Sequence, residues 1–454
     1  MRIEIREKLV LVSLILLPVV NAFMQAPPAA KSVFASDQVS TVRQDPPVLT
    51  LAGAIDLALK QASSFRGSRI GERIAAEDVI QAKAAFYPKF EAKPNYIFTS
   101  PSLGPVRPRL PSYLGANAIN EIQGLVVASG EIDTSGKLNA TLRHNQALLA
   151  SARAGTAIAR RDLIQGVTEA YYGLALATVK RSGAGKNLAF AEGFENNMKL
   201  QLDAGEVAPV DLVRARLQTA ARRDELAQAR TDEAVNADGL RSLIGYTFTD
   251  AVAVQDLMTE MPSDNEIERF AEAAIATRAE FAQFEADKKA AETEIDAAKA
   301  GRKPQFTYSV SSGLITDSLN PTRIKDRLGI QVNVGVTIPI FDWGAARSRE
   351  TQARLRLQQT ENTRQMAERQ FARDFFSART QAVSARTRIR SIAVAITDAE
   401  ANVSASTARY RSGEATILEV TDAENTLITQ RSALYQAIFD YQTARSRLMR
   451  AAGQ

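Results

Sequence analysis

The stretch YRSGEATILEVTDAENTL (residues 410–427) decides the fold, because LQLDAGEVAPVDLVRARL (residues 200–217) has the same pattern 208 positions upstream. Each stretch runs from a helical pattern through Gly-Glu and a short apolar patch, and then returns to a helical pattern. An acidic residue, Asp211 or Glu419, follows the glycine by six places. Glycine suits a tight helix-to-helix turn because it reaches left-handed backbone angles without steric cost. The chain is therefore predicted to hold two similar helical hairpins.

The repetition extends beyond these turns. A shift of 216 positions places Pro88 on Pro304 and Phe90 on Phe306, and a shift of 208 later places Gly205 on Gly413. Repetition on this scale indicates a duplicated architecture. We expect a signal peptide followed by a single protomer made of two repeats. The predicted boundaries are residues 1–35 for the signal peptide, 36–454 for the protomer, 50–250 for repeat 1 and 265–454 for repeat 2.

Very long helices are predicted in both repeats, with hairpin tips near residues 205 and 413. Proline is absent from residues 112–208 and after Pro339, and the only glycines after Gly344 are Gly413 and Gly453. Residues 345–411 alone predict one helix, which would be roughly 100 Å long at 1.5 Å per residue. Such a helix cannot bury itself in a globular core, so it needs neighbours of similar length, as in a coiled coil.

Four segments between the helices alternate apolar and polar residues, which predicts strands. They lie near residues 89–99, 120–130, 304–314 and 328–340, and LGIQVNVGVTI (residues 328–338) alternates without a break. Period-two alternation over about ten residues suits a transmembrane β-strand, although a half-buried strand of a soluble sheet has the same pattern. The loops between the strands of each pair, residues 99–119 and 313–327, are polar and rich in helix breakers.

The number of strands has a consequence for assembly. Four strands cannot close a barrel, since side chains fill the interior only at about eight strands. Open strand edges cannot lie in lipid, because their backbone groups would lack hydrogen-bond partners. If these strands are in a membrane, several copies of the chain must build one barrel together.

The composition excludes several classes of protein. The 454 residues carry a net charge of +5 and contain no cysteine, so disulfides and thiolate metal sites are excluded. The basic residues do not cluster, which argues against nucleic-acid binding. The apolar run LVLVSLILLPVV (residues 9–20) follows Arg2, Arg6 and Lys8, as in an export signal. The mature protein is expected to work outside the inner membrane.

With these features together, the chain resembles the TolC family of outer-membrane efflux channels. The resemblance is carried by LTLAGAIDLALKQASSF (residues 49–65), TEAYYGLALA (168–177), IPIFDWGAAR (338–347) and the paired turns. It implies an α+β membrane protein in which each protomer gives four transmembrane β-strands to the 12-stranded barrel of a homotrimer. The long helices would continue as an α-barrel across the periplasm.

The resemblance also implies a function and partners. The protein would be the outer-membrane exit duct of a tripartite efflux or export system, in contact with outer-membrane lipid. A periplasmic adaptor and an inner-membrane pump of the RND or ABC type would complete the exporter. The outer-membrane component of type I protein secretion is an alternative, since the same duct serves both. A different class of protein, a non-channel periplasmic coiled-coil scaffold or adaptor, is the structural competitor. Neither the cargo nor the pump can be read from the sequence.

Gate residues are implied on the two hairpins. Glu419 and Asp422 are three positions apart on one helix face, where the family carries acidic residues at the narrowest part of the closed tunnel. Asp211 and Tyr410 match a hydrogen-bonded pair that holds the family's tips closed. The chain departs from the family at Ala415, where an arginine is usual. The tip residues expected to dock an adaptor are Gly205, Glu206, Val207, Gly413, Glu414 and Ala415.

The sequence gives little support for enzyme activity or for a bound cofactor. His144 is the only histidine, so a nucleophilic triad would depend on it alone, and the seven methionines do not cluster. We therefore expect no enzyme activity, no cofactor and no metal site. Trp343 and Phe341 follow an apolar strand and form either an interfacial aromatic anchor or a plug at the strand-to-helix junction.

Overall fold

The computed structural model describes residues 48–61, 63–101, 119–260, 262–263, 265–318 and 320–454, all within the unit Pro47–Gln454. The predicted signal peptide and most of the loop 99–119 lie outside these residues. The described helices and strands are β1 (Val48–Leu49), α2 (Leu51–Lys60), α3 (Ser64–Ala84), β2 (Lys89–Phe98), β3 (Asn120–Ile132), α4 (Lys137–Asp203), α5 (Pro209–Ile244), β4 (Ala253–Val254), η1 (Leu257–Glu260), η2 (Ile267–Arg269), η3 (Glu272–Thr277), α6 (Ala279–Ala300), β5 (Gln305–Thr316), α7 (Pro321–Asp326), β6 (Leu328–Thr337), α8 (Ala345–Arg411) and α9 (Ile417–Ala451).

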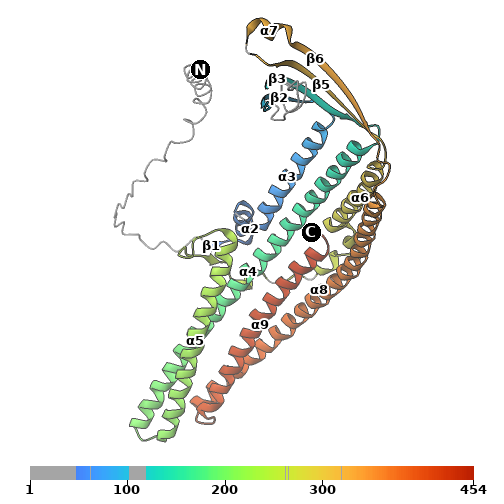
Figure 1. Cartoon of the computed structure of the whole chain (residues 1–454). Coiled ribbons are helices and arrows are strands. Elements are labelled where there is room, and N and C mark those ends of the chain that lie inside the picture. The colour runs from blue at the N-terminus through green and yellow to red at the C-terminus, as the bar shows by residue number, and fades with distance from the viewer. Residues whose placement is uncertain (1–47, 62, 102–118, 261, 264, 319) are drawn as a thin grey trace, which may run out of the picture. The chain divides into compact units, whose positions relative to one another are not determined.

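One order of elements occurs twice along the chain. The series α3, β2, β3, α4, α5 is followed by α6, β5, β6, α8, α9, and α7 is an addition to the second series. Helices α4 and α8 each contain 67 residues, so the helix predicted for residues 345–411 is confirmed. Each runs from the end of a strand to a hairpin turn, from which α5 or α9 returns (Figure 1).

Helices α8 and α9 pack through a regular apolar seam. The buried positions of α8 follow a spacing of three and four residues, at Phe375, Ala378, Ala382, Ala385 and Ile389. Those of α9 follow the same spacing, at Val420, Ala423, Leu427, Leu434, Ile438, Tyr441 and Leu448. This is the heptad pattern of a coiled coil, and the alanines allow the two helix axes to approach closely. Within the described chain, the expected neighbours of similar length are not found: α8, with 67 residues, packs against α6 and α9, which have 22 and 35 residues and cover it in succession.

The helices lie side by side in a fixed order. Near the strands the order is α3, α4, α6, α8, and near the hairpin turns it is α5, α4, α9, α8. In each series, every helix contacts the next one. Helix α8 therefore borders the layer on one side along its length. Helices α3 and α5 border it on the other side.

A carboxylate caps the start of each long helix, at its junction with the preceding strand. Asp133 accepts hydrogen bonds from the backbone N–H groups of Leu138 and Asn139, at 3.0 and 2.9 Å. Asp342 accepts one from the backbone of Ala346, at 2.7 Å. A negative group here accepts hydrogen bonds from otherwise unpaired N–H groups and interacts favourably with the helix dipole. Each such cap stabilises the fold by about 0.5–2 kcal/mol. The two junctions are therefore built alike.

The four strands form one antiparallel sheet in the order β2-β3-β5-β6. Each strand lies near its expected residues, with β3 and β5 extending a few residues beyond the expected ends and β6 ending at Thr337, before its expected end at 340. The expected loop 313–327 is shorter than predicted, because β5 continues to Thr316 and α7 fills much of the remainder. Within the described residues, β2 and β6 each have only one neighbouring strand, so both edges of the sheet are open.

The two faces of this sheet differ in polarity. Because residues opposite one another in an antiparallel pair project to the same side, the register brings the even-numbered residues of all four strands together. One face therefore joins the large apolar side chains Phe90, Tyr96, Phe98, Ile122, Val126, Phe306, Tyr308, Val310, Leu314, Leu328, Ile330, Val332, Val334 and Val336. The opposite face carries the polar residues Lys89, Glu91, Lys93, Asn95, Glu121, Gln123, Thr307, Ser309, Ser311, Gln331, Asn333 and Thr337, together with the apolar residues Ile97, Leu125, Val127 and Ile315.

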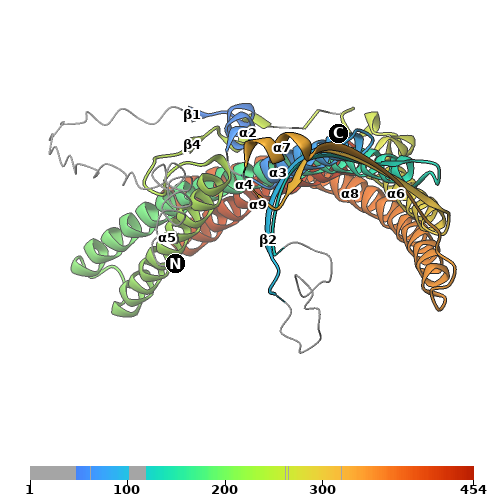
Figure 2. The ribbon, with the colours of Figure 1, turned by 45° about the horizontal axis from the view of Figure 1, so that its top comes forward.

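A second small sheet is attached to the middle of the helical layer. Strands β1 and β4 pair in parallel, and the buried hydroxyl of Tyr171 on α4 joins them. That hydroxyl donates to the carbonyl of Leu49 at 2.9 Å and accepts from the backbone N–H of Gln255 at 3.2 Å. Figure 2 shows β1 and α2 on one side of the long helices. The motif TEAYYGLALA thus anchors chain segments that are far apart in sequence.

In the part of the chain that the structure describes, the search for a helix long and apolar enough to cross a membrane finds none.

Candidate functional site at the hairpin tips

The two hairpin turns have the same backbone geometry. In the first, the N–H of Glu206 donates to Gln201 O at 2.8 Å and that of Gly205 donates to Leu202 O at 2.9 Å. In the second, Glu414 donates to Arg409 O at 2.9 Å and Gly413 to Tyr410 O at 3.0 Å. These paired bonds define a Schellman motif, which needs a left-handed residue at its centre. Both glycines have φ of 78°, so the glycine of each Gly-Glu pair meets a requirement of the backbone.

The returning helices begin in different ways. Pro209 opens α5, and Ala208 before it supplies no side-chain cap. Thr416 caps α9, with its hydroxyl oxygen accepting from the backbone N–H of Glu419 at 3.4 Å. Glu419 is also the third residue of α9, where a carboxylate interacts favourably with the helix dipole. Part of the reason for an acidic residue at this position is therefore local.

The predicted gate carboxylates lie on the outside of the second hairpin. Glu419 and Asp422 are both exposed, on the first two turns of α9. The carboxylate of Glu419 accepts a hydrogen bond from Arg409 Nη1 at 3.3 Å, and the same guanidinium donates to the carbonyl of Glu414, also at 3.3 Å. Asp422 makes no ion pair with any residue that the structure describes. Arg409 thus joins the two helices across the turn and neutralises one of the two predicted gate charges.

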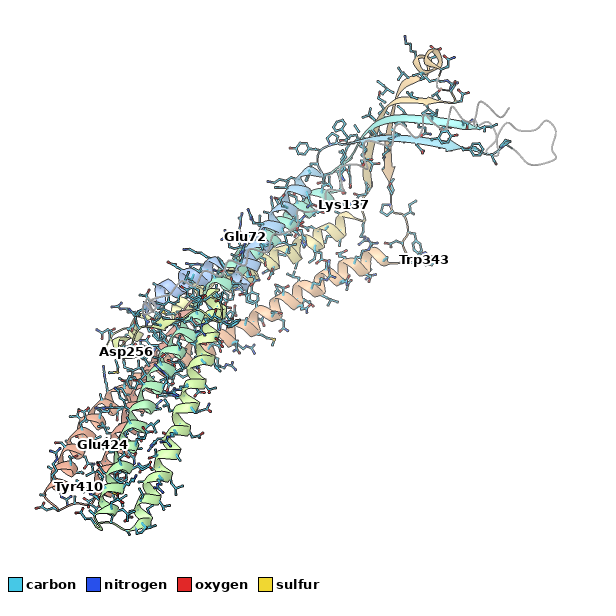
Figure 3. The ribbon with its side chains drawn as sticks, turned by 90° about the vertical axis from the view of Figure 1, so that its left-hand side faces the viewer. Glu72, Lys137, Asp256, Trp343, Tyr410 and Glu424 are labelled. Atoms are coloured by element: carbon cyan, nitrogen blue, oxygen red, sulfur yellow. The ribbon has the colours of Figure 1, made fainter. Side chains whose placement is uncertain are left out.

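The predicted pair of Asp211 and Tyr410 is not joined within the described chain. Asp211 pairs with Arg214 on the next turn of its own helix, at 3.4 Å. Tyr410 is half-buried, and its hydroxyl bonds to none of the described residues. Figure 3 shows Tyr410 at the tip and Glu424 further along the hairpin. The hydrogen bond between Asp211 and Tyr410 therefore stays a prediction.

The two hairpins are held together differently near their tips. A small apolar cluster of Met198, Leu212 and Ala215, with Phe194 and Leu202 against it, lies inside the first hairpin. The second hairpin buries smaller side chains at the equivalent positions, which are Ser406, Val420 and Ala423, and adds the polar contacts of Arg409 across its turn. Surface ion pairs contribute at most about 1 kcal/mol each, whereas burying one large apolar side chain contributes about 1.5–3 kcal/mol. The second hairpin therefore buries less apolar side chain at its tip than the first.

The expected docking residues lie at the ends of the hairpins. Gly205, Glu206, Gly413 and Glu414 are exposed, and Val207 and Ala415 are half-buried. Exposed apolar side chains continue from them along the first hairpin, at Leu200, Val210, Val213 and Leu217. The last three are spaced for one face of α5. On the second hairpin, Leu418 is the exposed counterpart of Val210.

Sequence reasoning missed Arg409 and the apolar stripe on α5. Both leave a signal in the sequence. Arg409 is four residues before the turn glycine, in the last helical turn, where a long basic side chain reaches the end of the helix. The stripe follows the spacing i, i+3, i+7 that indicates one helix face.

At the opposite end of the helical layer, Trp343 follows β6. It is 90% exposed, has φ of 55°, and packs edge-on against Phe341 with ring centroids 4.8 Å apart. Figure 3 shows it at the start of α8, far from Tyr410. The two interpretations of Trp343, an interfacial anchor and a junction plug, both remain predictions.

Metal-binding geometry was also searched. Among residues 48–61, 63–101, 119–260, 262–263, 265–318 and 320–454, no group of three or more histidine, aspartate or glutamate side chains is arranged to hold a metal ion. His144 instead uses Nδ1 in a 3.0 Å hydrogen bond with the carbonyl oxygen of Ala290 on α6.

Comparison with known proteins gives concordant results. A family model described as outer membrane efflux protein matches residues 54–246 and 271–454. The outer membrane protein TolC of Escherichia coli (strain K12) is 21% identical over 296 residues, which are 62% of this chain and 59% of that protein. The aligned part of this chain therefore spans somewhat less than two thirds of the length of that relative.

Solved structures share the fold over most of the chain. The VceC outer membrane protein of Vibrio cholerae superposes with a TM-score of 0.75 at 18% identity, covering 89% of this chain and 96% of its own. The CmeC outer membrane channel of Campylobacter jejuni gives 0.77 at 16% identity, with 89% and 85% covered. The open state of the MtrE outer membrane channel of Neisseria gonorrhoeae gives 0.75 at 20% identity, with 89% and 88% covered.

Proposed function

Because the chain belongs to the outer membrane efflux protein family, we propose that it is the outer-membrane exit duct of a tripartite efflux system. Family membership confirms the resemblance drawn from the sequence and locates the protein in the outer membrane of the cell. In the proposed role the protein is a passive homotrimeric channel. Its hairpin tips are gated and receive cargo from a periplasmic adaptor and an inner-membrane pump.

The observation that carries the proposal is the four-stranded sheet with one apolar face, one polar face and two open edges. Strands of ten to thirteen residues are long enough to cross the hydrocarbon core of a bilayer when tilted. The apolar face suits lipid and the polar face suits a water-filled lumen. A soluble scaffold would leave this broad apolar face in water, which disfavours that alternative.

Closure of the barrel supports a homotrimer. Open strand edges are not tolerated in lipid, so β6 of one copy must pair with β2 of the next. Such a contact joins two different surfaces, and repeating it with a closing rotation makes a ring. The same rotation brings α8 of one copy against α3 and α5 of the next. Three copies give twelve strands and a continuous wall of helices.

The gate proposal rests on the second hairpin. Glu419 and Asp422 are exposed near its tip, and three copies would bring six carboxylates together. A ring of like charges attracts cations and focuses the field in a narrow opening. The smaller side chains buried at the second tip support its movement during opening. The bond between Asp211 and Tyr410 would form when the tips close.

The tips are also the proposed docking surface for the adaptor. Gly205, Glu206 and Val207 on one hairpin and Gly413, Glu414 and Ala415 on the other are small, apolar or exposed. The apolar stripe on α5 gives a partner helix a surface to bury. The pump would be of the RND or ABC class, and the pump would determine the cargo.

The test is single-channel recording of the purified protein in a planar bilayer with asymmetric salt. We expect discrete steps of small conductance and a cation-selective reversal potential. Neutralising both gate residues, Glu419→Gln with Asp422→Asn, should reduce the cation preference several-fold. Glu424→Gln is the matched control, since its position is rotated by about 140° from Glu419 on the same helix.

The outcomes separate the two parts of the proposal. Absence of steps from correctly folded protein would refute the duct itself. Steps whose cation preference survives in the double variant would keep the duct and refute the gate assignment. Equal loss in the Glu424→Gln control would show that general surface charge sets the preference.

A further inference from the structure

A cavity of about 520 Å³ lies far from the tips and from the membrane sheet, between α2, α4, α9 and the start of α6. Its volume is within the range of about 300–1,000 Å³ that is typical of small-molecule sites. Basic, apolar and uncharged polar side chains line it. The basic ones are Arg160, Arg161, Arg445 and Arg450. The apolar ones include Leu51, Ile55, Ile164 and Met449, which are all half-buried.

Two of these arginines hold unpaired donors. Arg161 is 8% exposed, and its Nη atoms bind both oxygens of Glu280 at 3.0 and 2.6 Å, but its Nε donates to no atom of the described chain. Arg445 pairs with Glu266 at 2.5 Å, and its Nε is likewise without an acceptor. Among the described residues, these are the only two buried side-chain nitrogen or oxygen atoms that lack a partner. A buried donor without an acceptor destabilises the folded state, so each of these atoms favours a ligand that accepts a hydrogen bond.

The acidic residues around the cavity do not balance its cations. Asp162 is shared between Arg161, at 3.3 Å, and Arg450, at 2.9 Å. Glu280 is shared between Arg161 and Arg278, at 2.6 and 2.7 Å.

Arg160 is exposed and makes no ion pair with any residue that the structure describes. Four lining arginines and Arg278 behind them thus meet three side-chain carboxylates, which are Asp162, Glu266 and Glu280. The net charge at the cavity is positive.

We propose that this cavity binds an amphipathic organic anion, a carboxylate on a compact apolar body. Arginine is the side chain suited to a carboxylate, because its planar fork donates two parallel hydrogen bonds. Arg160 and Arg450 would bind the carboxylate, and the cluster behind them would contribute the positive field. Leu51, Ile55 and Met449 would cover the apolar body.

The site also couples parts of the fold. Leu51 and Ile55 lie on α2, whereas Arg160 lies on α4 and Arg450 on α9. Helices α4 and α9 come from the two different hairpins. A ligand held here would join both hairpins in the middle of the helical layer.

The experiment is ¹⁹F NMR on the full chain in lipid nanodiscs, with 4-(trifluoromethyl)benzoate as the probe. The matching alcohol, 4-(trifluoromethyl)benzyl alcohol, has the apolar body without the charge, and empty nanodiscs correct for partitioning into lipid. We expect the carboxylate to bind at least tenfold more tightly than the alcohol. Acetate, which has the charge without the apolar body, should compete only weakly.

Variants then locate the site. Arg160→Gln with Arg450→Gln should weaken binding at least tenfold. Arg447→Gln is the matched control, because Arg447 also pairs with a carboxylate of α4, Glu169 at 3.0 Å, but does not line the cavity. Ser446→Phe, which places a ring in the cavity, should abolish binding and leaves every arginine intact. Far-UV circular dichroism and the elution volume check that each variant is folded.

The inference fails if the alcohol binds as tightly as the carboxylate. It also fails if the probe does not bind at all, or if Arg447→Gln weakens binding as much as the double variant. Binding that persists in folded Ser446→Phe protein would place the probe elsewhere. None of these measurements depends on conduction, so their result is separate from that of the proposed duct.

Discussion

At the scale of single residues, Arg409 is the main addition that the structure makes to the gate. Its guanidinium lies 3.3 Å from the carboxylate of Glu419 and is bonded to the carbonyl of Glu414 across the turn. The first hairpin has Gln201 at the equivalent position, so this arginine belongs to one repeat only. It moderates the negative charge that the proposed gate presents.

Replacing Arg409 by glutamine should make the channel more selective for cations. The change leaves Glu419 without its partner and copies the residue found in the first hairpin. Since exposed ion pairs contribute up to about 1 kcal/mol, we expect a change of a few-fold in relative cation permeability. The reversal potential in asymmetric salt measures it. Arg411→Gln removes an equal charge two residues away. An equal shift in both variants would contradict the specific role of Arg409.

Glu280 is expected to control stability at low pH. Burial alone raises the pKa of Glu280, but the hydrogen bonds from Arg161 and Arg278 outweigh burial and lower the pKa to about 2. Because the folded pKa is lower than the ordinary value of 4.5, the stabilisation is complete above pH 4.5 and is lost as the pH falls towards 2. At 1.36 kcal/mol per pKa unit, this is roughly 3 kcal/mol.

Glu280→Gln should therefore lower the thermal unfolding midpoint at neutral pH and flatten its decline between pH 4.5 and 2. Glu285→Gln is the control, because Glu285 lies on the same helix with an exposed carboxylate. Unfolding curves followed by circular dichroism across this pH range give the measurement. A decline in Glu280→Gln as steep as in the unchanged protein would show that other carboxylates dominate.

At the scale of elements, the two faces of the sheet predict which strand positions face lipid and which face the lumen. Val332 lies on the apolar face of β6 and Gln331 on the polar face. A lysine at position 332 would face lipid and would destabilise the folded protein by about 2–4 kcal/mol near the middle of the bilayer. A lysine at position 331 would face the lumen.

Val332→Lys should therefore reduce the amount of folded protein recovered in membranes, and Gln331→Lys should be tolerated. Fractionation followed by gel analysis of folded and heat-unfolded samples compares the two. Equal recovery of both variants would argue that this sheet does not face lipid. Loss of Gln331→Lys alone would mean that the faces are reversed.

At the scale of the whole molecule, the open edges make a prediction about assembly. Strands β2 and β6 are separated by two others in the sheet, which places them roughly 14 Å apart at 4.8 Å per strand. The chain has no native cysteine, so Asn95→Cys with Asn333→Cys gives two unique thiols, one on each edge. A short bismaleimide should link them between copies and give a covalent trimer on a denaturing gel.

Each single variant is the control for that experiment, since one thiol per chain links at most two chains. A covalent ladder that continues beyond three copies would indicate an open assembly in place of a closed ring. Protein that stays monomeric after treatment, with both thiols modified, would contradict the pairing of β6 with β2 in a neighbouring copy.

How much of this architecture could be predicted depends on the distance between interacting residues. Helix α8 and strand β6 were predictable because their signals repeat every few residues and depend on local backbone geometry. The turns at Gly205 and Gly413 were predictable because a left-handed residue is needed within a few positions of each helix end. The predicted bounds of the loop 313–327 were less accurate, since the end of β5 depends on pairing with β3 and β6.

The sequence by itself determined the helices, the alternating strands, the duplicated turns and the family, because each depends on patterns along the chain. Only the tertiary structure decided which distant groups meet. Arg161 and Glu280 are 119 positions apart, and nothing local to either residue indicates the ion pair or the cavity beside it. The order of strands, the open edges and the charge around that cavity are likewise set by packing. Long-range contacts follow from how faces fit together, and that information is spread over the whole chain.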